Sequence, residues 1–352
     1  TCHAVGAQRA ARPLPADLAL LRHSGKGHGH GLNILARMPS PVPAASASAS
    51  ASASASASAR PLDAVALARV QRRLLAAAQA PWLHGEVARR MAERLPVVRL
   101  QPACVADWGA FLGASGDVLA RAYPRARRVA VEPDAARRDA TAVALAPPWW
   151  SPRRWTPTVT VLTPDEVAAG QAQLLWANMG LHGATDPAAV MRQWHRALAV
   201  DGFLMFSTLG PGTLTRLQGV YAQQGWAAPF APFVDMHDLG DLLVEVGFAD
   251  PVMDQETVTL TWASAAALLD ELRTLGGNAA RGRHAGLRTP RWRRRLQDAL
   301  ADTAGPDGRV ALDFEIVYGH AFRPPPRPRL AARTEVPLDD LRTMARAGRR
   351  AT

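Results

Sequence analysis

The chain has 352 residues, of which 48% are apolar and 20% charged, which is typical of one large or two small globular domains. It has no run of 18 apolar residues, which argues against an ordinary transmembrane helix. Two cysteines, Cys2 and Cys104, exclude a disulfide framework and a cysteine-based zinc cluster. No secretory segment is recognisable, so we expect a cytoplasmic location.

The formal net charge of +11 taken as a whole suggests a nucleic-acid binder, but most of this charge lies in the two ends of the chain. Residues 1–60 hold six basic residues and one acid, and residues 323–352 hold eight arginines and three acids. The 262 residues between them hold 27 basic and 26 acidic residues and therefore have a net charge of only +1. We expect neither a nucleic-acid partner nor a membrane partner.

Low-complexity segments flank the central part of the chain. Residues 1–60 are predicted to be a disordered lead that ends in an Ala/Ser repeat, and residues 323–352 a disordered Pro/Arg-rich tail, with a possible short helix at 338–347. The Gly/His tract at 27–31 is read as low complexity rather than as a metal site. The folded domain is predicted to span residues 61–322.

Hydrophobic periodicity predicts the elements of this domain. An opening helical part, 61–100, is followed by short apolar strands that alternate with helices, although 134–158 is less regular. The predicted helices are 64–78, 82–95, 116–123, 188–199 and 214–223, and the predicted strands are 104–106, 129–131, 159–162, 174–176 and 203–206. Alternation of this kind predicts an α/β fold with a mostly parallel sheet covered by helices on both faces.

The last part of the domain does not continue the alternation of short strands and helices. Residues 255–262 and 312–322 alternate as strands, and helices at 264–275 and 289–301 form an insert of about 264–304 between them. A strand that comes late, after a parallel sheet, is most easily added in the antiparallel direction, so seven strands are expected in all.

A glycine-containing turn follows the first strand, in the stretch VADWGAFLG at 105–113. Asp107, Gly109 and Gly113 lie where a ligand can approach the backbone at the start of a helix. Glu132 ends the second strand, where a carboxylate can accept hydrogen bonds from both ribose hydroxyls of a nucleoside. The alternative is that both glycines only form a turn and Glu132 is a solvated strand end.

This arrangement resembles the S-adenosylmethionine-dependent methyltransferases of the Rossmann-like class. Asp107, Gly109 and Gly113 match the first motif of that class, Asp-x-Gly-x-Gly-x-Gly, and Glu132 falls at its ribose-binding position. Phe111 replaces the middle glycine. Its ring either fills the space that the cofactor crosses or turns away from it.

Downstream stretches are similar to one branch of that class, the malonyl-acyl-carrier-protein O-methyltransferases. The likeness covers about 80–323 and is carried by LLWANMGLH at 174–182, DGFLMFSTLGPGTL at 201–214, FVDMHDLGDLL at 233–243 and GFADPVMD at 247–254. It is weakest across 134–172, and Gln173 replaces the usual acid before the fourth strand. The resemblance implies S-adenosylmethionine as the cofactor and an acyl carrier protein as the partner.

The resemblance also implies roles for two further residues. Asp165, or its neighbour Glu166, would hold the adenine amino group after the third strand, although both also suit the start of a small helix. Asn178, at the end of the fourth strand, would face the cofactor crevice.

Seven arginines and no acid lie between 281 and 295. We expect Arg281, Arg283 and Arg288 to dock the acidic carrier protein. The alternatives are a solvated arginine-rich face and a phosphate-binding site.

Together these features predict methylation of the free carboxylate of a malonyl thioester in biotin biosynthesis. No Ser/His/Asp or Cys/His set is present, and a carboxylate acceptor needs no general base. Phe111, Gln173 and the segment 134–172 leave one alternative: a catalytically impaired relative that acts as a binding or regulatory module.

Overall fold

The computed structural model describes residues 19–21, 60–146 and 159–326. Most of the two tails predicted to be disordered, the helix at 338–347 and residues 147–158 of the irregular interval therefore lie outside the described residues. Within the lead, the strand at 19–21 and the buried Arg60 contradict the prediction of disorder. The helices are α2 (Ala64–Leu75), α3 (Trp82–Ala92), α4 (Ala110–Gly113), α5 (Gly116–Ala122), α6 (Ala135–Leu145), α7 (Pro187–Ala197), α8 (Thr215–Gln223), α9 (Met236–Val246), α10 (Ala265–Leu275) and α11 (Pro290–Ala301). The strands are β1 (Ala19–Leu21), β2 (Cys104–Trp108), β3 (Arg127–Val131), β4 (Val159–Leu162), β5 (Ala172–Ala177), β6 (Leu198–Leu209), β7 (Ala249–Trp262) and β8 (Val310–Phe322).

The strands form one mixed sheet in the order β1-β7-β8-β6-β5-β2-β3-β4. β2 pairs in parallel with β3 and β5, and β3–β4 and β5–β6 are also parallel pairs. β8 is antiparallel to both of its neighbours, β6 and β7. The predicted mostly parallel sheet with a late antiparallel strand is confirmed. The three residues of β1 add a short antiparallel edge beside β7 that the sequence did not indicate.

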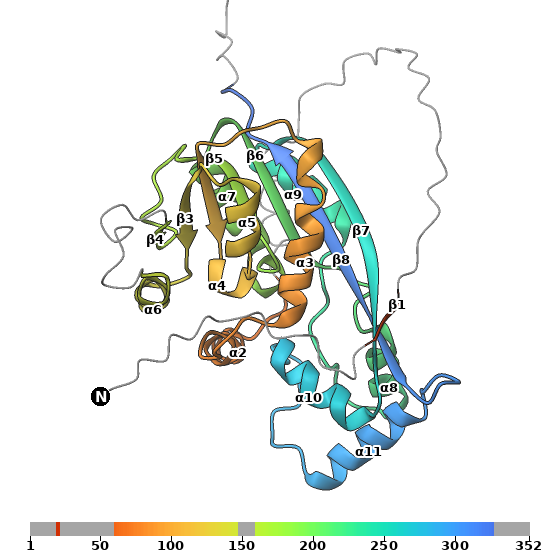
Figure 1. Ribbon diagram of the computed structural model, residues 1–352. Coiled ribbons are helices and arrows are strands. Elements are labelled where there is room, and N and C mark those ends of the chain that lie inside the picture. Colours follow the sequence, from red (N-terminus) through yellow and green to blue (C-terminus); the bar gives the residue numbers. More distant parts are fainter. Residues whose placement is uncertain (1–18, 22–59, 147–158, 327–352) are drawn as a thin grey trace, which may run out of the picture.

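Side chains of β5 show how the sheet forms two cores. Leu174 and Trp176 belong to the cluster that includes α3, α5, α8, α10 and α11. Leu175 and Ala177 belong to the cluster that includes α7 and α9. Because successive residues of a strand point to opposite faces, a continuous apolar run fits a strand that is covered on both sides. Figure 1 shows α3 and α5 in front of the strands and α7 and α9 behind them.

Side-chain caps fix where several helices begin. Asp63, Asp186, Asp235, Ser264 and Thr289 each accept a hydrogen bond from a backbone N–H in the first turn of α2, α7, α9, α10 and α11. These are the residue types preferred at that position, because they satisfy N–H groups that have no partner within the helix. Proline follows the cap of α7 and of α11, where its missing N–H costs nothing.

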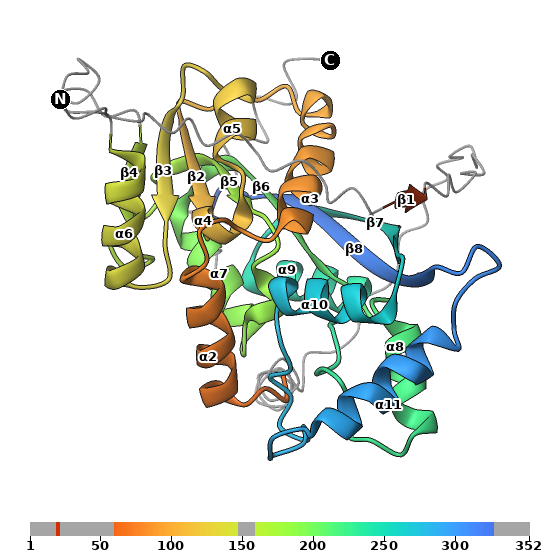
Figure 2. The same cartoon turned by 60° about the horizontal axis from the view of Figure 1, so that its bottom comes forward.

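The helices α2, α8, α10 and α11 gather at the end of the molecule toward which β2 and β3 point (Figures 1 and 2). That end of a parallel sheet is where ligands bind in this class of fold. Within the described residues, no helix is long and apolar enough to cross a membrane.

Three local predictions were wrong. The interval after Glu132 contains a regular helix, α6, whose first turn is capped by Asp134. The helix predicted to reach residue 199 ends at Ala197, because β6 begins at Leu198 and pairs there with Ala172. α9 was not predicted, although Asp235 caps it and Gly247 ends it in the left-handed conformation that favours glycine.

Candidate active site

Two acidic side chains lie buried at the carboxyl ends of neighbouring parallel strands. Asp107 is in β2 and is 5% exposed, and Glu132 directly follows β3 and is 1% exposed. The backbone N–H of Glu132 donates to the carbonyl of Leu162 in β4, which extends the sheet by one residue. Glu132 is therefore not a solvated strand end.

The glycine turn connects these two strand ends. Gly109 has a φ of +71°, and its N–H donates to Val131 O over 2.7 Å. The N–H of Gly113 donates back to Gly109 O, which closes the single turn α4. The N–H of Phe111 donates to Glu132 Oε1 over 3.0 Å. The turn and the strand-end carboxylate thus form one hydrogen-bonded unit.

Phe111 and Arg137 cover Glu132. The Arg137 guanidinium carbon lies 3.4 Å from the centre of the Phe111 ring, and Arg137 Nε is 3.9 Å from Glu132 Oε2. Arg137 also donates to Leu75 O at the end of α2 over 2.8 Å, and Thr141 donates its hydroxyl to Glu132 Oε1 over 3.0 Å. Of the two positions left open for the Phe111 ring, the structure shows the first: together with Arg137 the ring lies in the space that a nucleoside bound to Glu132 would enter.

Burial sets the protonation of the two carboxyl groups. It raises the pKa of Asp107 to about 7, with a further contribution from the charge of Glu132 and an opposing one from Arg128. Burial also raises the pKa of Glu132, against the hydrogen bonds that it accepts from Thr141 and Phe111. Asp107 Oδ1 and Glu132 Oε2 are buried and accept no hydrogen bond within the described structure. Such oxygens are free to accept one from a ligand.

Asn178 holds the neighbouring backbone together. Its amide nitrogen donates to His84 O and to Gly113 O over 2.7 and 2.6 Å, and its oxygen accepts from the Ser207 hydroxyl over 2.6 Å. The residue is 1% exposed. Its amide therefore ties α3, the glycine turn and β6 to the end of β5.

Asp165 lies apart from this cluster. It is exposed, three residues beyond the end of β4. Its neighbour Glu166 accepts from the Thr163 N–H over 2.7 Å and pairs with Arg138 of α6 over 2.5 Å.

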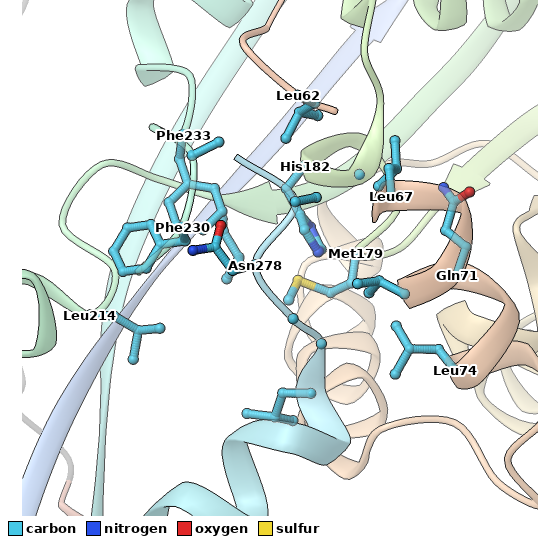
Figure 3. A pocket seen from close by; sticks show the side chains of 18 of the residues that line it. Leu62, Leu67, Gln71, Leu74, Met179, His182, Leu214, Phe230, Phe233 and Asn278 are labelled. Carbon is cyan, nitrogen blue, oxygen red and sulfur yellow. The ribbon is translucent and has the colours of Figure 1, made fainter. Parts of the chain in front are cut away.

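An apolar cavity of 270 Å³ opens on the other side of the glycine turn. Figure 3 shows Leu67, Gln71 and Leu74 of α2 on one side of it, Phe230 and Phe233 on the other, and Met179 and His182 between them. Leu112 of α4 and His84 of α3 also line it, and His84 Nδ1 lies 2.7 Å from Leu112 O. The cavity thus shares a wall with the turn that contacts Glu132.

The two histidines of this cavity are held neutral. Burial lowers the pKa of His84 to about 4, and it lowers that of His182 to about 3 with help from the charges of His84 and Arg60. Neither histidine carries charge near neutral pH, so the two rings add no charge to the cavity. Among the described residues, no group of three or more His, Cys, Asp or Glu is arranged to hold a metal ion.

Acidic residues of other elements offset part of the positive charge of the arginine-rich segment 281–295. Arg283 pairs with Asp63 at the start of α2 over 2.7 Å, and Arg293 pairs with Asp270 of α10 over 2.9 Å. Arg288 stacks on Trp292, with its guanidinium carbon 4.4 Å from the ring centre. Arg281, whose Nε donates to Leu62 O, lies in an exposed stretch.

The sequence did not reveal three residues that shape the site. Arg137 and Thr141 belong to α6, and the only available signal was Asp134 as a helix cap three residues before Arg137. Arg60 lies directly after the Ala/Ser repeat, at the edge of the cavity, where no periodicity marks it.

No protein-family model matches the chain, but full-length relatives do. A protein named malonyl-[acyl-carrier protein] O-methyltransferase from Laribacter hongkongensis is 37% identical over 256 residues, which are 71% of this chain and 86% of the relative. Proteins of the same name from Halorhodospira halophila and Gallionella capsiferriformans are 38% and 36% identical and are covered over 87% and 85% of their lengths.

Among solved structures, a putative methyltransferase from Bacillus halodurans is covered completely by 67% of this chain, at a TM-score of 0.44 and 12% identity. Membership of a family therefore follows from the sequence relatives, three of which exceed 35% identity over more than four fifths of their length. The chain belongs to the malonyl-[acyl-carrier protein] O-methyltransferase family.

Proposed function

We propose that this protein is an S-adenosylmethionine-dependent methyltransferase that methylates the free carboxylate of a malonyl thioester carried by an acyl carrier protein, in biotin biosynthesis. The relatives are named malonyl-[acyl-carrier protein] O-methyltransferases, which supports the methyl transfer and the acceptor. The observation that supports it here is a pair of buried carboxylates with unpartnered oxygens, joined by the glycine turn to an apolar cavity. We further propose that residues 61–322 form the methyltransferase domain, with residues 264–304 as a helical insert.

The donor set fits the nucleoside part of this cofactor. Glu132 Oε2 is an acceptor for ribose hydroxyls, and Asp107 Oδ1 is a second unpartnered acceptor one strand away. The left-handed Gly109 leaves the backbone open to a ligand, because a Cβ there would meet no atom within 4 Å. Asp165, exposed beyond β4, remains the candidate for the adenine amino group. Phe111 and Arg137 must move from Glu132 when a nucleoside enters.

The chain's own residues bind and align rather than transfer protons. The apolar cavity excludes water from the acceptor, and the neutral His84 and His182 add no charge to it. When bound, S-adenosylmethionine supplies the methyl group, and an ionised carboxylate acceptor needs no general base. Rate enhancement then depends on the alignment of the two reactants.

The exposed arginines beside α11 are our candidate docking surface for the acidic carrier protein. Arg281 lines a surface hollow next to the cavity, and the half-buried Arg288 lies two residues before α11. Arg283 is less available, because Asp63 already pairs with it. The cytoplasmic location remains a prediction that follows from this biosynthetic role.

The alternative of a catalytically impaired module is not favoured. It was motivated by Phe111, Gln173 and the segment before β5. Gln173 has a local structural role, because its side-chain oxygen accepts from the Cys104 N–H over 2.8 Å. The relatives, moreover, are all named as methyltransferases.

A methyl-transfer assay tests the proposal. The full chain is incubated with S-adenosylmethionine and malonyl-acyl carrier protein, and the mass of the carrier protein is followed. We expect a gain of one methyl group per malonyl group, and acetyl-acyl carrier protein should remain unchanged. Glu132→Gln should lose most of the rate, whereas Glu93→Gln, at an exposed position on the surface, should not. Absence of methylation by the folded wild-type chain would contradict the proposal.

A further inference from the structure

Arg60 is a buried arginine without a carboxylate partner. The residue is 7% exposed, and no described carboxylate lies within ion-pair distance of it. Its guanidinium donates to two backbone carbonyls, Pro232 O over 2.7 Å and His182 O, and its carbon lies 5.7 Å from the centre of the Phe233 ring, so all its described partners are neutral. Its Nε is buried and has no hydrogen-bond partner in the described structure. A buried charge is costly unless it is paired, so an unpaired one implies an anion that is supplied from outside.

Nearby carboxylates do not fill that role. Asp63 accepts from the N–H groups that begin α2 and pairs with Arg283. Asp186 caps α7 and lies 3.5 Å from Arg192. Both acids line the surface hollow on the outer side of Arg60, but both are engaged elsewhere. Burial, uncompensated by an anion, lowers the pKa of Arg60, which still remains charged.

The position of Arg60 joins two spaces. It lines the surface hollow that also includes Arg281, and it lines the apolar cavity that ends at Leu112 of the glycine turn. Among the described residues that line this cavity, Arg60 is the only arginine or lysine, and no Asp or Glu is among them. The cavity therefore offers one cation to a ligand that is otherwise surrounded by uncharged, mostly apolar side chains.

We propose that Arg60 binds the carboxylate of the methyl acceptor and thereby selects a malonyl thioester over an acyl thioester that lacks a charge. This inference rests on the proposed function. It names Arg60 as the residue that recognises the negative charge of the methyl acceptor. A guanidinium fits a carboxylate through paired N–H donors and leaves acceptor lone pairs open to the methyl group. The apolar walls strengthen the ion pair. Methylation removes the negative charge, so the ester product loses this contact and leaves.

Binding measurements test this role without relying on turnover. Malonyl-pantetheine and its methyl ester are titrated by calorimetry into the full chain in the presence of S-adenosylhomocysteine, which cannot donate a methyl group. We expect the charged thioester to bind roughly 10- to 100-fold more tightly than the ester, the range expected for a hydrogen-bonded charged pair. Arg60→Met should abolish this ratio, and Arg60→Lys should restore part of it. Arg216→Met, on the exposed side of α8, is the matched control and should keep the full ratio.

Arg60 also holds two backbone carbonyls, so the folding of its variants is checked by thermal unfolding and by their affinity for S-adenosylhomocysteine. If Arg60→Met fails this check, Arg60→Lys carries the test. Equal affinity of the wild type for both thioesters would overturn the inference, as would an undiminished ratio in a folded Arg60 variant. Methyl transfer is assayed in parallel: turnover without charge discrimination contradicts the role of Arg60 alone, whereas absence of turnover contradicts the proposed function.

Discussion

Phe111 occupies the position at which the glycine motif of the class departs from its pattern, and its ring stacks on a guanidinium that also approaches Glu132. A cation–aromatic contact of this kind stabilises by about 1–2 kcal/mol when it is partly desolvated. A nucleoside that reaches Glu132 has to displace this contact. The substitution at 111 therefore lowers cofactor affinity without removing the groups that bind the cofactor.

Replacing Arg137 should reveal that cost. Arg137→Gln shortens the side chain, keeps it polar and removes the stacked cation, so we expect S-adenosylhomocysteine to bind up to roughly tenfold more tightly. Isothermal titration gives the affinity, and Arg121→Gln, exposed on α5, serves as the control. Weaker binding by Arg137→Gln would show instead that this guanidinium contacts the cofactor.

Asp107 makes stability depend on pH. Burial raises its pKa to about 7 in the folded chain, above its usual value of 3.8. Between about pH 4 and pH 7 the unfolded chain therefore binds fewer protons at this position, and the contribution of Asp107 to the free energy of unfolding falls as pH rises. Asp107→Asn removes that contribution.

Urea unfolding at pH 5 and pH 8 measures the effect. The free energy of unfolding of Asp107→Asn minus that of the wild type should be larger at pH 8 than at pH 5, by up to a few kcal/mol. Asp117→Asn, exposed on α5, should follow the wild type. Parallel stability curves for the wild type and Asp107→Asn would mean that Asp107 is not buried as described.

At the scale of elements, β8 shows why its sequence needs a small residue. Gly319 pairs with Phe206 across the sheet, and a Cβ at 319 would lie 2.9 Å from Met253 Sδ and closer still to the Phe206 ring. Gly219, on the exposed face of α8, has no atom within 4 Å of such a Cβ. The two glycines should therefore respond in opposite directions to the same substitution.

Gly319→Ala should lower the free energy of unfolding by about 1–3 kcal/mol, because the packed rings must shift. Gly219→Ala should raise it by about 0.5–1 kcal/mol, because alanine favours the helix. Urea titration of both variants provides the comparison. Equal effects of the two substitutions would contradict the described pairing of β6, β7 and β8.

Features that depend on neighbouring residues could be predicted from the sequence, whereas contacts between residues distant in the sequence could not. Val159–Leu162 is set by a local apolar run and was predicted with both of its ends, whereas β6 and β7 begin five and six residues before their predicted starts at 203 and 255. The turn at Gly109 and the acid at Glu132 were also local signals, and the structure joins them. Arg137 could not be placed on Phe111, because that contact depends on how α6 packs after β3. Arg60 is a similar case, since its partners lie more than 120 residues away.

Over the whole molecule, the uneven distribution of charge gives the domain one basic end. The arginines between 281 and 295 extend along α11, away from β2, β3 and β4 (Figure 1). Asp63 and Asp270 pair with two of these arginines, Arg283 and Arg293, and offset their charge. Arg291 and Arg294 are exposed, and we therefore expect them to supply a larger share of the positive field at this end. Such a field accelerates encounter with an acidic partner and weakens in salt.

Charge reversal at this end should affect the carrier protein alone. The double variant Arg291→Glu and Arg294→Glu should raise the KM for malonyl-acyl carrier protein roughly tenfold at low salt and leave the affinity for S-adenosylhomocysteine unchanged. The difference from the wild type should shrink as salt is added. An unchanged KM would place the docking surface elsewhere.

The central claim is that the buried carboxylates at the ends of β2 and β3 form a nucleoside site. Calorimetric titration of S-adenosylhomocysteine into the full chain and into Glu132→Ala tests it most directly. We expect one site per chain in the wild type and a loss of affinity of tenfold or more in the variant, since a charged acceptor is removed. At 100 times its dissociation constant the ligand should also stabilise the wild type by about 2.7 kcal/mol. No heat of binding and no stabilisation at millimolar ligand, or equal affinity of both chains, would contradict the account.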